Sequence, residues 1–218
     1  MAHKKPREVA IIGLGRFGGS LARRLEELGQ SVLGIDLDPQ RAKEIADEIT
    51  ETLLLDATDP EALEQADITA FKTVIVAIGD DFEANALVTS SLKSMGVPQI
   101  ISLASSRRHR DILLRIGADR VVIPNEESGS HLADELSNPG MLSSLPLSPD
   151  YSLLQLQVPA GMVRKNVQEC ERYEINVLLI VRGPELLLTP DWDFRFQQGD
   201  ILVVVGDKKR LAEFSSLS

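Results

Sequence analysis

The chain has 218 residues, a length that suits one large domain or two modest ones. Hydrophobic residues make up 43% of it, enough for a packed core, so general disorder is not expected. The formal net charge of −10 argues against broad binding to nucleic acid or to an anionic membrane, because both need a basic face. The single cysteine, Cys170, excludes a disulfide within the chain. The sequence has no apolar run of about 18 residues and no apolar leader, so we expect neither a membrane span nor a signal peptide. We therefore expect a cytoplasmic location.

A short apolar run and a glycine-rich turn open the chain. Residues 9–12 predict a buried parallel strand, and Gly13, Gly15 and Gly18 follow it in the spacing G-x-G-x-x-G at the start of a helix. In this pattern the first glycine permits a tight turn, the second lets the backbone approach a phosphate, and the third lets helix and strand pack closely. The N–H groups and the dipole at a helix N-terminus favour the charge of a phosphate.

An acidic residue completes this pattern. Residues 31–35 predict a second strand, which ends at Asp36, near the spacing of about 20 residues expected for the acid that binds a ribose. Its carboxylate can accept hydrogen bonds from both ribose hydroxyls. Strand, glycines, helix, strand and acid in this order indicate a Rossmann-type half with a nucleotide site. The alternative is a glycine-rich turn in an α/β domain whose nucleotide site no longer functions.

Strand and helix signals continue to alternate as far as residue 123. Strands are predicted at 52–55, 73–78, 99–103 and 120–123, and helices at 38–48, 59–66, from 81 to about 95 and at 107–116. Six strands in alternation with helices predict an α/β fold with a Rossmann-type, doubly wound parallel sheet. The strand at 73–78 is apolar after its first residue, so we expect it near the centre. Ligands of such sheets bind beyond the carboxyl ends of the strands.

The pattern changes after one more helix, expected over 126–136. Asn-Pro-Gly at 138–140 ends this helix, and the Ser- and Pro-rich residues 143–150 are interpreted as a linker. We therefore predict a nucleotide-binding domain at 1–140, and the linker with a smaller α+β domain at 141–218. Within the smaller domain, strands are predicted at 153–158, 177–181, 186–188 and 201–205, and helices at 166–173 and 208–214. A domain of this size is marginal by itself, so we expect self-association to stabilise it.

No catalytic constellation accompanies the nucleotide motif. His3, His109 and His131 have no Ser, Cys or carboxylate partner at a recognisable catalytic spacing, and Cys170 is interpreted as a small buried hydrophobe. The sequence has no CxxC, HExxH or GxSxG motif, and we expect no metal site. A nucleotide site without catalytic groups favours a sensor over an enzyme.

Several motifs together resemble the Ktr/Trk regulators of bacterial potassium uptake, which are built from RCK (KTN) domains. They are Ile-Gly-Leu-Gly-Arg-Phe-Gly-Gly-Ser at 12–20, Gly-Ile-Asp at 34–36, Val-Ala-Ile-Gly at 76–79, Ile-Gly-Ala-Asp-Arg at 116–120 and the final strand at 199–206. The resemblance covers essentially the whole chain. It implies a non-enzymatic cytoplasmic subunit, peripheral to the inner face of the membrane, that forms homodimers and rings of dimers (octamers). Such a subunit gates a membrane potassium channel or transporter when ATP, ADP or NAD(H) binds.

By position, the resemblance also implies which residues line the nucleotide. Arg16 reaches the terminal phosphate, and Asp36 holds the ribose and repels the 2′-phosphate of NADP. The implied set is Gly13, Leu14, Gly15, Arg16, Phe17, Gly18, Asp36, Asp56, Ala57, Ile78, Gly79, Asp80, Ser105 and His109. The alternative role of Arg16 is a surface salt bridge, and the alternative role of both Asp80 and Asp81 is to cap the helix that they begin.

Two positions depart from the family pattern. Leu103 stands where many Ktr-type members have a lysine, which weakens the phosphate cage, and Asn125 stands where they have a glutamate, which weakens the expectation of a divalent ion between subunits. Some relatives bind cyclic di-AMP in the second domain; residues 162–181 cover that region, where the alternative is a dimerisation surface. An NAD-dependent oxidoreductase and a structural RCK module with a non-functional nucleotide site stay open as alternative functions.

Overall fold

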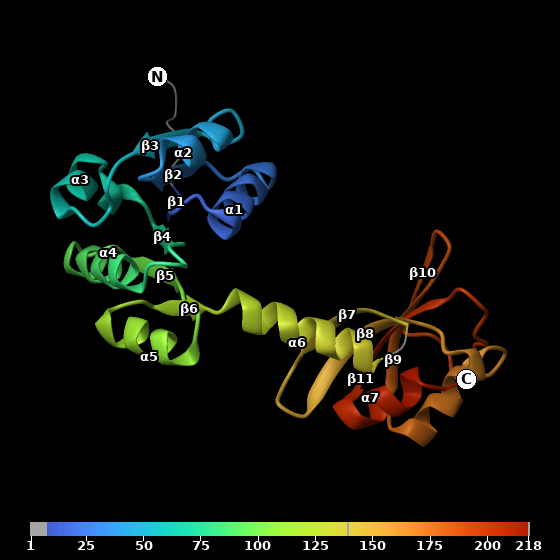
Figure 1. Cartoon of the computed structure of the whole chain (residues 1–218). Helices are drawn as coiled ribbons and strands as arrows, with labels where there is room; N and C mark the ends of the chain where they lie inside the picture. Colours follow the sequence, from blue (N-terminus) through green and yellow to red (C-terminus); the bar gives the residue numbers. More distant parts are fainter. Residues whose placement is uncertain (1–7, 139, 218) are drawn as a thin grey trace. The chain divides into compact units, whose positions relative to one another are not determined.

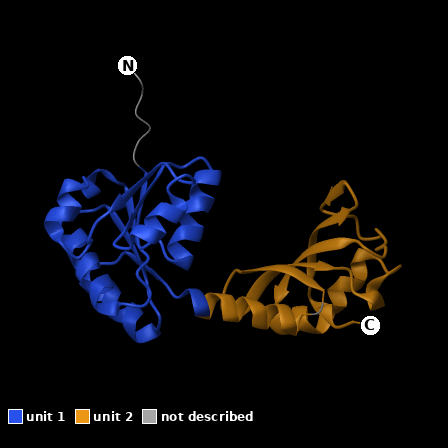
Figure 2. Ribbon diagram, turned by 45° about the horizontal axis from the view of Figure 1, so that its top comes forward, with its two compact units in different colours: residues 1–125 blue, residues 126–218 orange. Residues whose placement is uncertain are grey.

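The computed structural model describes residues 8–138 and 140–217. His3 and Pro139 lie outside the described residues. The chain divides into two compact units, residues 1–125 and 126–218 (Figure 2). This division differs from the one predicted after residue 140, because nearly all of helix α6 (Pro124–Ser137) is grouped with the second unit.

A six-stranded parallel sheet organises the first unit (Figure 1). Its strands are β1 (Val9–Ile12), β2 (Val32–Asp36), β3 (Glu51–Leu54), β4 (Thr73–Val76), β5 (Gln99–Leu103) and β6 (Arg120–Val122). The order is β3-β2-β1-β4-β5-β6, and all the pairs are parallel. The predicted Rossmann-type fold is thus confirmed, with β4 at the centre and the reversal of strand order between β1 and β4.

The helices of the first unit begin largely where the sequence predicts. They are α1 (Arg16–Glu27), α2 (Pro39–Ile45), α3 (Pro60–Gln65), α4 (Phe82–Ser94) and α5 (Arg107–Ile116), with a 3-10 helix η1 (Ile68–Ala70). Asp38 and Asp59 accept hydrogen bonds from backbone N–H groups two residues on, and a proline follows each, which confirms both predicted helix starts. The predicted ends of the elements are less accurate than their starts. For example, β4 ends at Val76 and does not continue to Ile78 as predicted.

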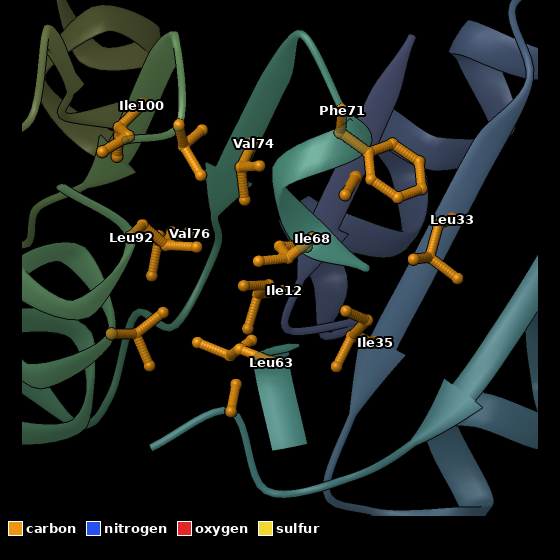
Figure 3. Close-up of a cluster of buried hydrophobic side chains, with 14 residues drawn as sticks. Ile12, Leu33, Ile35, Leu63, Ile68, Phe71, Val74, Val76, Leu92 and Ile100 are labelled. Atoms are coloured by element: carbon orange, nitrogen blue, oxygen red, sulfur yellow. The ribbon is translucent and has the colours of Figure 1, made fainter. Parts of the chain in front are cut away.

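Alternate residues of the inner strands β1, β2 and β4 enter two separate cores, one on each face of the sheet. On one face Ile12 and Val76 pack with Leu63 of α3, Ile68 of η1 and Leu92 of α4 (Figure 3). On the other face the intervening residues pack against α1 and α2. This alternation explains why the strands consist almost wholly of apolar residues.

The second unit is a five-stranded antiparallel sheet in the order β10-β9-β11-β8-β7. The strands are β7 (Met141–Pro146), β8 (Tyr151–Gln157), β9 (Asn176–Arg182), β10 (Glu185–Leu188) and β11 (Ile201–Asp207). Besides most of α6, the unit contains helix α7 (Lys208–Ser215) and the 3-10 helices η2 (Ala160–Met162) and η3 (Val167–Tyr173). Their buried side chains form one core, which includes Phe196, Phe214 and Cys170.

The linker predicted at 143–150 is wrong in its first half. β7 pairs with β8 as far as Pro146↔Ser152, so only the following residues form a turn. The Ser- and Pro-rich composition was misleading because β7 is an edge strand, where a proline at the end removes no essential ladder hydrogen bond.

Cys170 is buried in the core of the second unit, as the sequence predicts. Burial, with a smaller contribution from the charge of Glu169, raises the pKa of its thiol to about 12. The thiolate is therefore negligible at neutral pH, and the side chain is an inert hydrophobe.

A buried ion pair joins β9 to the turn before β11. Asp200 is 1% exposed, and its two carboxylate oxygens accept hydrogen bonds from Arg182 Nε at 2.8 Å and Nη2 at 2.7 Å. The backbone N–H of Gln197 also donates to this carboxylate, and the Arg182 guanidinium lies 4.7 Å from the centre of the Phe194 ring. Burial by itself raises the pKa of Asp200, but the hydrogen bonds from Arg182 and Gln197 outweigh it, so the pKa lies below its usual value.

We expect this pair to make the second unit sensitive to acid. Because the folded-state pKa of Asp200 is lowered, its stabilisation is complete well above about pH 4 and is lost as the pH falls through the folded-state pKa. Asp200→Asn should cost roughly 3 kcal/mol at pH 7 and flatten the dependence of stability on pH between 7 and 3. Urea unfolding of the full chain, followed by far-UV circular dichroism and Trp192 fluorescence, measures both effects. Asp193→Asn, at an exposed site of the same unit, is the control that should change neither.

Candidate nucleotide-binding site

The predicted site residues follow the carboxyl ends of five neighbouring strands. The glycine turn follows β1, Asp36 ends β2, Asp56 and Ala57 follow β3, Ile78–Asp80 follow β4, and Ser105 follows β5. Because all these strands are parallel, their carboxyl ends lie along the same edge of the sheet. The structure thus brings the predicted segments to one edge, as the sequence suggests.

The glycine turn has the geometry that its spacing predicts. Gly13 has φ +97°, its N–H donates to the Ile35 carbonyl at 2.7 Å, and an added Cβ would lie 2.9 Å from the Ala77 carbonyl oxygen. A Cβ at Gly18 would overlap the Gly13 carbonyl oxygen, so no larger residue fits there. Gly15 differs, because the nearest atom to an added Cβ is Arg41 Nη1 at 3.7 Å. Of these three glycines, Gly15 could take a Cβ without a steric clash, and it lies at the N-terminus of α1, where the backbone N–H groups favour an anionic ligand.

Asp36 connects the turn to β2 and α2. Its Oδ2 accepts a hydrogen bond from the Leu14 N–H at 2.6 Å, and its Oδ1 accepts one from the Asp38 N–H at 2.8 Å. The side chain is 7% exposed. A carboxylate has about four lone-pair positions, so two positions stay available for ribose hydroxyls. The carboxylate is already oriented by the backbone, which reduces the entropy lost on binding.

Two arginines lie at this part of the sheet edge. Arg16 is the first residue of α1 and is exposed, and within residues 8–138 and 140–217 it forms no ion pair; the alternative role of a surface salt bridge is not seen there. Arg41, on α2, was missed by the sequence reasoning. Its Nη1 lies 3.9 Å from Asp36 Oδ2, and its Nε lies 3.5 Å from Asp38 Oδ2. Only the fold brings this guanidinium beside both Gly15 and Asp36.

The segments after β3 and β4 are more open. Asp56 is exposed, and its Oδ1 accepts hydrogen bonds from the Thr58 hydroxyl and N–H, which lower the pKa of the carboxyl. Ala57 is buried in the core. Gly79 and Asp80 are exposed, and the cap of α4 is Asp81, which accepts from the Ala84 N–H at 2.9 Å. Of the two acids predicted as alternative helix caps, the structure confirms Asp81 and not Asp80.

A stacked pair of rings lies beside β5. The His109 ring packs on the ring of Phe82 at 4.0 Å between centroids and 20° between planes, and its Nδ1 lies 3.0 Å from Ser105 Oγ. Phe82 was not predicted as part of the site. Leu103 is buried in the core, where a hydrophobic side chain packs well.

A further residue missed from the sequence is Asn85 on α4. It is 1% exposed and donates hydrogen bonds to the carbonyls of Ile78 and Leu103. A signal was present, because Asn85 occupies the buried helix face that also carries Val88, Thr89 and Leu92. A polar residue on such a face must find hydrogen-bond partners.

The described part of the chain contains no group of three or more His, Cys, Asp or Glu side chains arranged to hold a metal ion. In the same part, none of the helices has both the length and the apolar character needed to cross a bilayer.

The fold defines a two-unit protein with a Rossmann-type first unit and an antiparallel second unit. Residues 9–124 match the TrkA-N domain, and residues 153–218 match the TrkA-C domain. The chain belongs to the family of TrkA-N/TrkA-C domain proteins, which confirms the resemblance to Ktr/Trk regulators.

Similarity to individual proteins extends over the whole chain. Ktr system potassium uptake protein A of Bacillus subtilis (strain 168) is 32% identical over 219 residues, 99% of each chain, and protein C of the same strain is 33% identical over 211 residues, 95% of this chain and 96% of the relative. The crystal structure of the GsuK RCK domain matches this chain over its entire length, with a TM-score of 0.67 at 19% identity. The match spans 48% of the GsuK chain. A GsuK channel bound to NAD gives a TM-score of 0.66 at 18% identity, over 40% of that chain.

The two acids at the ends of β2 and β3 make a matched pair of test positions. Asp36→Asn places an amide NH₂ against one of two backbone N–H donors, because both oxygens of Asp36 accept. We expect it to lower the stability of the unliganded protein by about 1–3 kcal/mol. Asp56→Asn can keep its carbonyl oxygen on Thr58, so its stability should stay nearly unchanged. Thermal unfolding followed by circular dichroism compares the two, and equal losses would show that Asp36 does not organise the turn.

Proposed function

We propose that this chain is a cytoplasmic regulatory subunit that senses adenine nucleotides and gates a membrane potassium channel or transporter. The observation that carries the proposal is the oriented Asp36 carboxylate beside the glycine turn and the N-terminus of α1. The full-length similarity to Ktr system potassium uptake proteins A and C supports the role in potassium transport. NAD in the GsuK channel supports a nucleotide as the ligand.

Each part of the nucleotide has a chemically suitable partner along the edge of the sheet. The ribose binds Asp36, the phosphates lie over Gly15 at the N-terminus of α1, and Arg16 pairs with the terminal phosphate. The adenine lies by Asp56 and Ala57, and Ile78–Asp80, Ser105 and His109 border the far side. Because ATP and ADP differ in charge next to Arg16, they stabilise different positions of this residue and of α1, and that difference is the signal.

The proposal assigns no catalytic step to the chain. Binding shifts the balance between two conformations, and a homodimer or a ring of dimers at the inner face of the membrane passes the shift to the membrane subunit. For the second unit, cyclic di-AMP stays a prediction, as does the boundary of the first domain at residue 140 with α6 as a crossover helix. An NAD-dependent oxidoreductase would need hydride transfer to a small substrate, and no contact in the described residues favours it.

Nucleotide binding is tested by thermal unfolding with ATP, ADP, NADH and NADPH. A ligand that binds only the folded state at a hundred times its Kd stabilises by about 2.7 kcal/mol, so the unfolding midpoint should rise by several degrees. NADPH should raise it least, because its 2′-phosphate meets the charge of Asp36. Asp36→Ala should abolish the shift. If none of these nucleotides moves the midpoint, the proposed sensor function is wrong, and the result favours the alternative of a structural module with a non-functional nucleotide site.

The role of Arg16 is tested by titration calorimetry with ATP and ADP. Arg16→Ala should reduce the ratio of ATP to ADP affinity by about tenfold, corresponding to ~1.4 kcal/mol, while ADP still binds. Arg24→Ala removes the same charge from the same helix, where Arg24 pairs with Glu27 at the surface, and should leave the ratio unchanged. An equal effect of both variants would indicate only a general loss of positive charge.

A further inference from the structure

Three buried polar side chains form a network between α4 and β5. Asn85, Thr89 and Ser102 are 1%, 0% and 0% exposed. Thr89 Oγ1 lies 2.9 Å from Ser102 Oγ and donates to Asn85 Oδ1 at 3.3 Å. The Asn85 amide nitrogen donates at 2.7 Å to the Ile78 carbonyl and at 3.1 Å to the Leu103 carbonyl. Both protons and the oxygen of the Asn85 amide are therefore in use.

The network lies where β4 and β5 separate. The last paired residues of these strands are Val76 and Ser102. Beyond them, the Ile78 and Leu103 carbonyls are outside the ladder that joins β4 to β5. Asn85 bridges these two carbonyls, so one side chain replaces the hydrogen bonds by which the sheet holds the strands together.

The two carbonyls belong to the two segments that border the far side of the predicted site. Ile78 begins the segment Ile78–Asp80, and Leu103 directly precedes Ala104 and Ser105. In a buried environment of low polarity a satisfied network is rigid, and an unsatisfied group is costly. Asn85 thus holds these segments at one separation, although its own side chain is buried.

We propose that Asn85 is a positioning residue of the nucleotide site, which fixes the gap between Ile78–Asp80 and Ala104–Ser105 before the ligand arrives. This inference rests on the proposed function. Without the amide, the two segments move independently, and ordering them again on binding costs conformational entropy. The loss is therefore one of nucleotide affinity in addition to any loss of stability.

The test measures ADP affinity by titration calorimetry on the full chain, because ATP, ADP and NADH all contain the ADP group. Asn85→Leu keeps the side-chain size but cannot donate, and should weaken ADP binding by about tenfold, ~1.4 kcal/mol. Thr89→Val is the matched control: it alters the same network at the same burial but leaves the donors to Ile78 and Leu103 in place. It should lower the unfolding midpoint and leave the affinity within twofold.

Asn85→Asp adds a readout that a merely structural residue does not move. When ionised, the introduced carboxyl faces two carbonyl oxygens and donates nothing; when protonated, it donates to one of them. The ADP affinity of this variant should therefore recover as the pH falls from 8 to 6, relative to the unsubstituted chain. That comparison subtracts the charged or titratable groups on the neighbouring segments, which include Asp80, Asp81 and His109, because they are common to both proteins. If Asn85→Leu fails to fold, the pH dependence of ADP affinity in Asn85→Asp tests the positioning role by itself.

The outcomes separate the inference from the function on which it rests. If the unsubstituted chain binds none of ADP, ATP and NADH, the proposed function is wrong. If it binds ADP, and Asn85→Leu binds equally well or Asn85→Asp shows the pH profile of the unsubstituted chain, the function stands and the positioning role of Asn85 is overturned. If Thr89→Val weakens ADP binding as much as Asn85→Leu, the effect is general to the network and the specific role of Asn85 is likewise overturned.

Discussion

The short hydrogen bond between the Asp36 carboxylate and the Leu14 N–H joins the two strands on which the first unit depends. It closes the glycine turn against the end of β2 and, through the Asp38 N–H, also fixes the start of α2. Asp36 is thus part of the folded framework before any ligand is present. The residue proposed to bind the ribose therefore also determines the shape of the loop proposed to bind the phosphates, so structural and binding contributions at this position are coupled.

Two arginines lie among the acids at the edge of the sheet, although the chain carries a net charge of −10. Arg41 lies near Asp36 and Asp38, and Arg16 extends from the start of α1 without an ion-pair partner among the described residues. A phosphate that enters this region meets a helix N-terminus and guanidinium groups close to a carboxylate. The arrangement suits an anionic ligand that binds and leaves, because the positive charge of Arg41 is partly offset by neighbouring carboxylates.

The second unit obtains its rigidity differently. Its sheet is antiparallel, and the turn before β11 is anchored by Asp200 on Arg182, where the desolvation of the carboxylate is compensated by two hydrogen bonds from one guanidinium and one from Gln197. Buried polar groups with complete sets of partners therefore occur in both units, at Asn85 in the first and at Asp200 in the second. In each case one side chain secures a segment that leaves the sheet.

The sequence by itself determined the Rossmann-type sheet, the glycine turn with Asp36, and the family, because these depend on local patterns: apolar runs, helix caps and the spacing of Gly13, Gly15 and Gly18. Only the tertiary structure decided which polar groups meet across elements that are far apart in the chain. Arg41 reaches Gly15, Asn85 reaches Leu103, and β7 adds to the edge of the second sheet despite its loop-like composition. Such contacts carry no local signature, since each depends on how whole strands and helices pack.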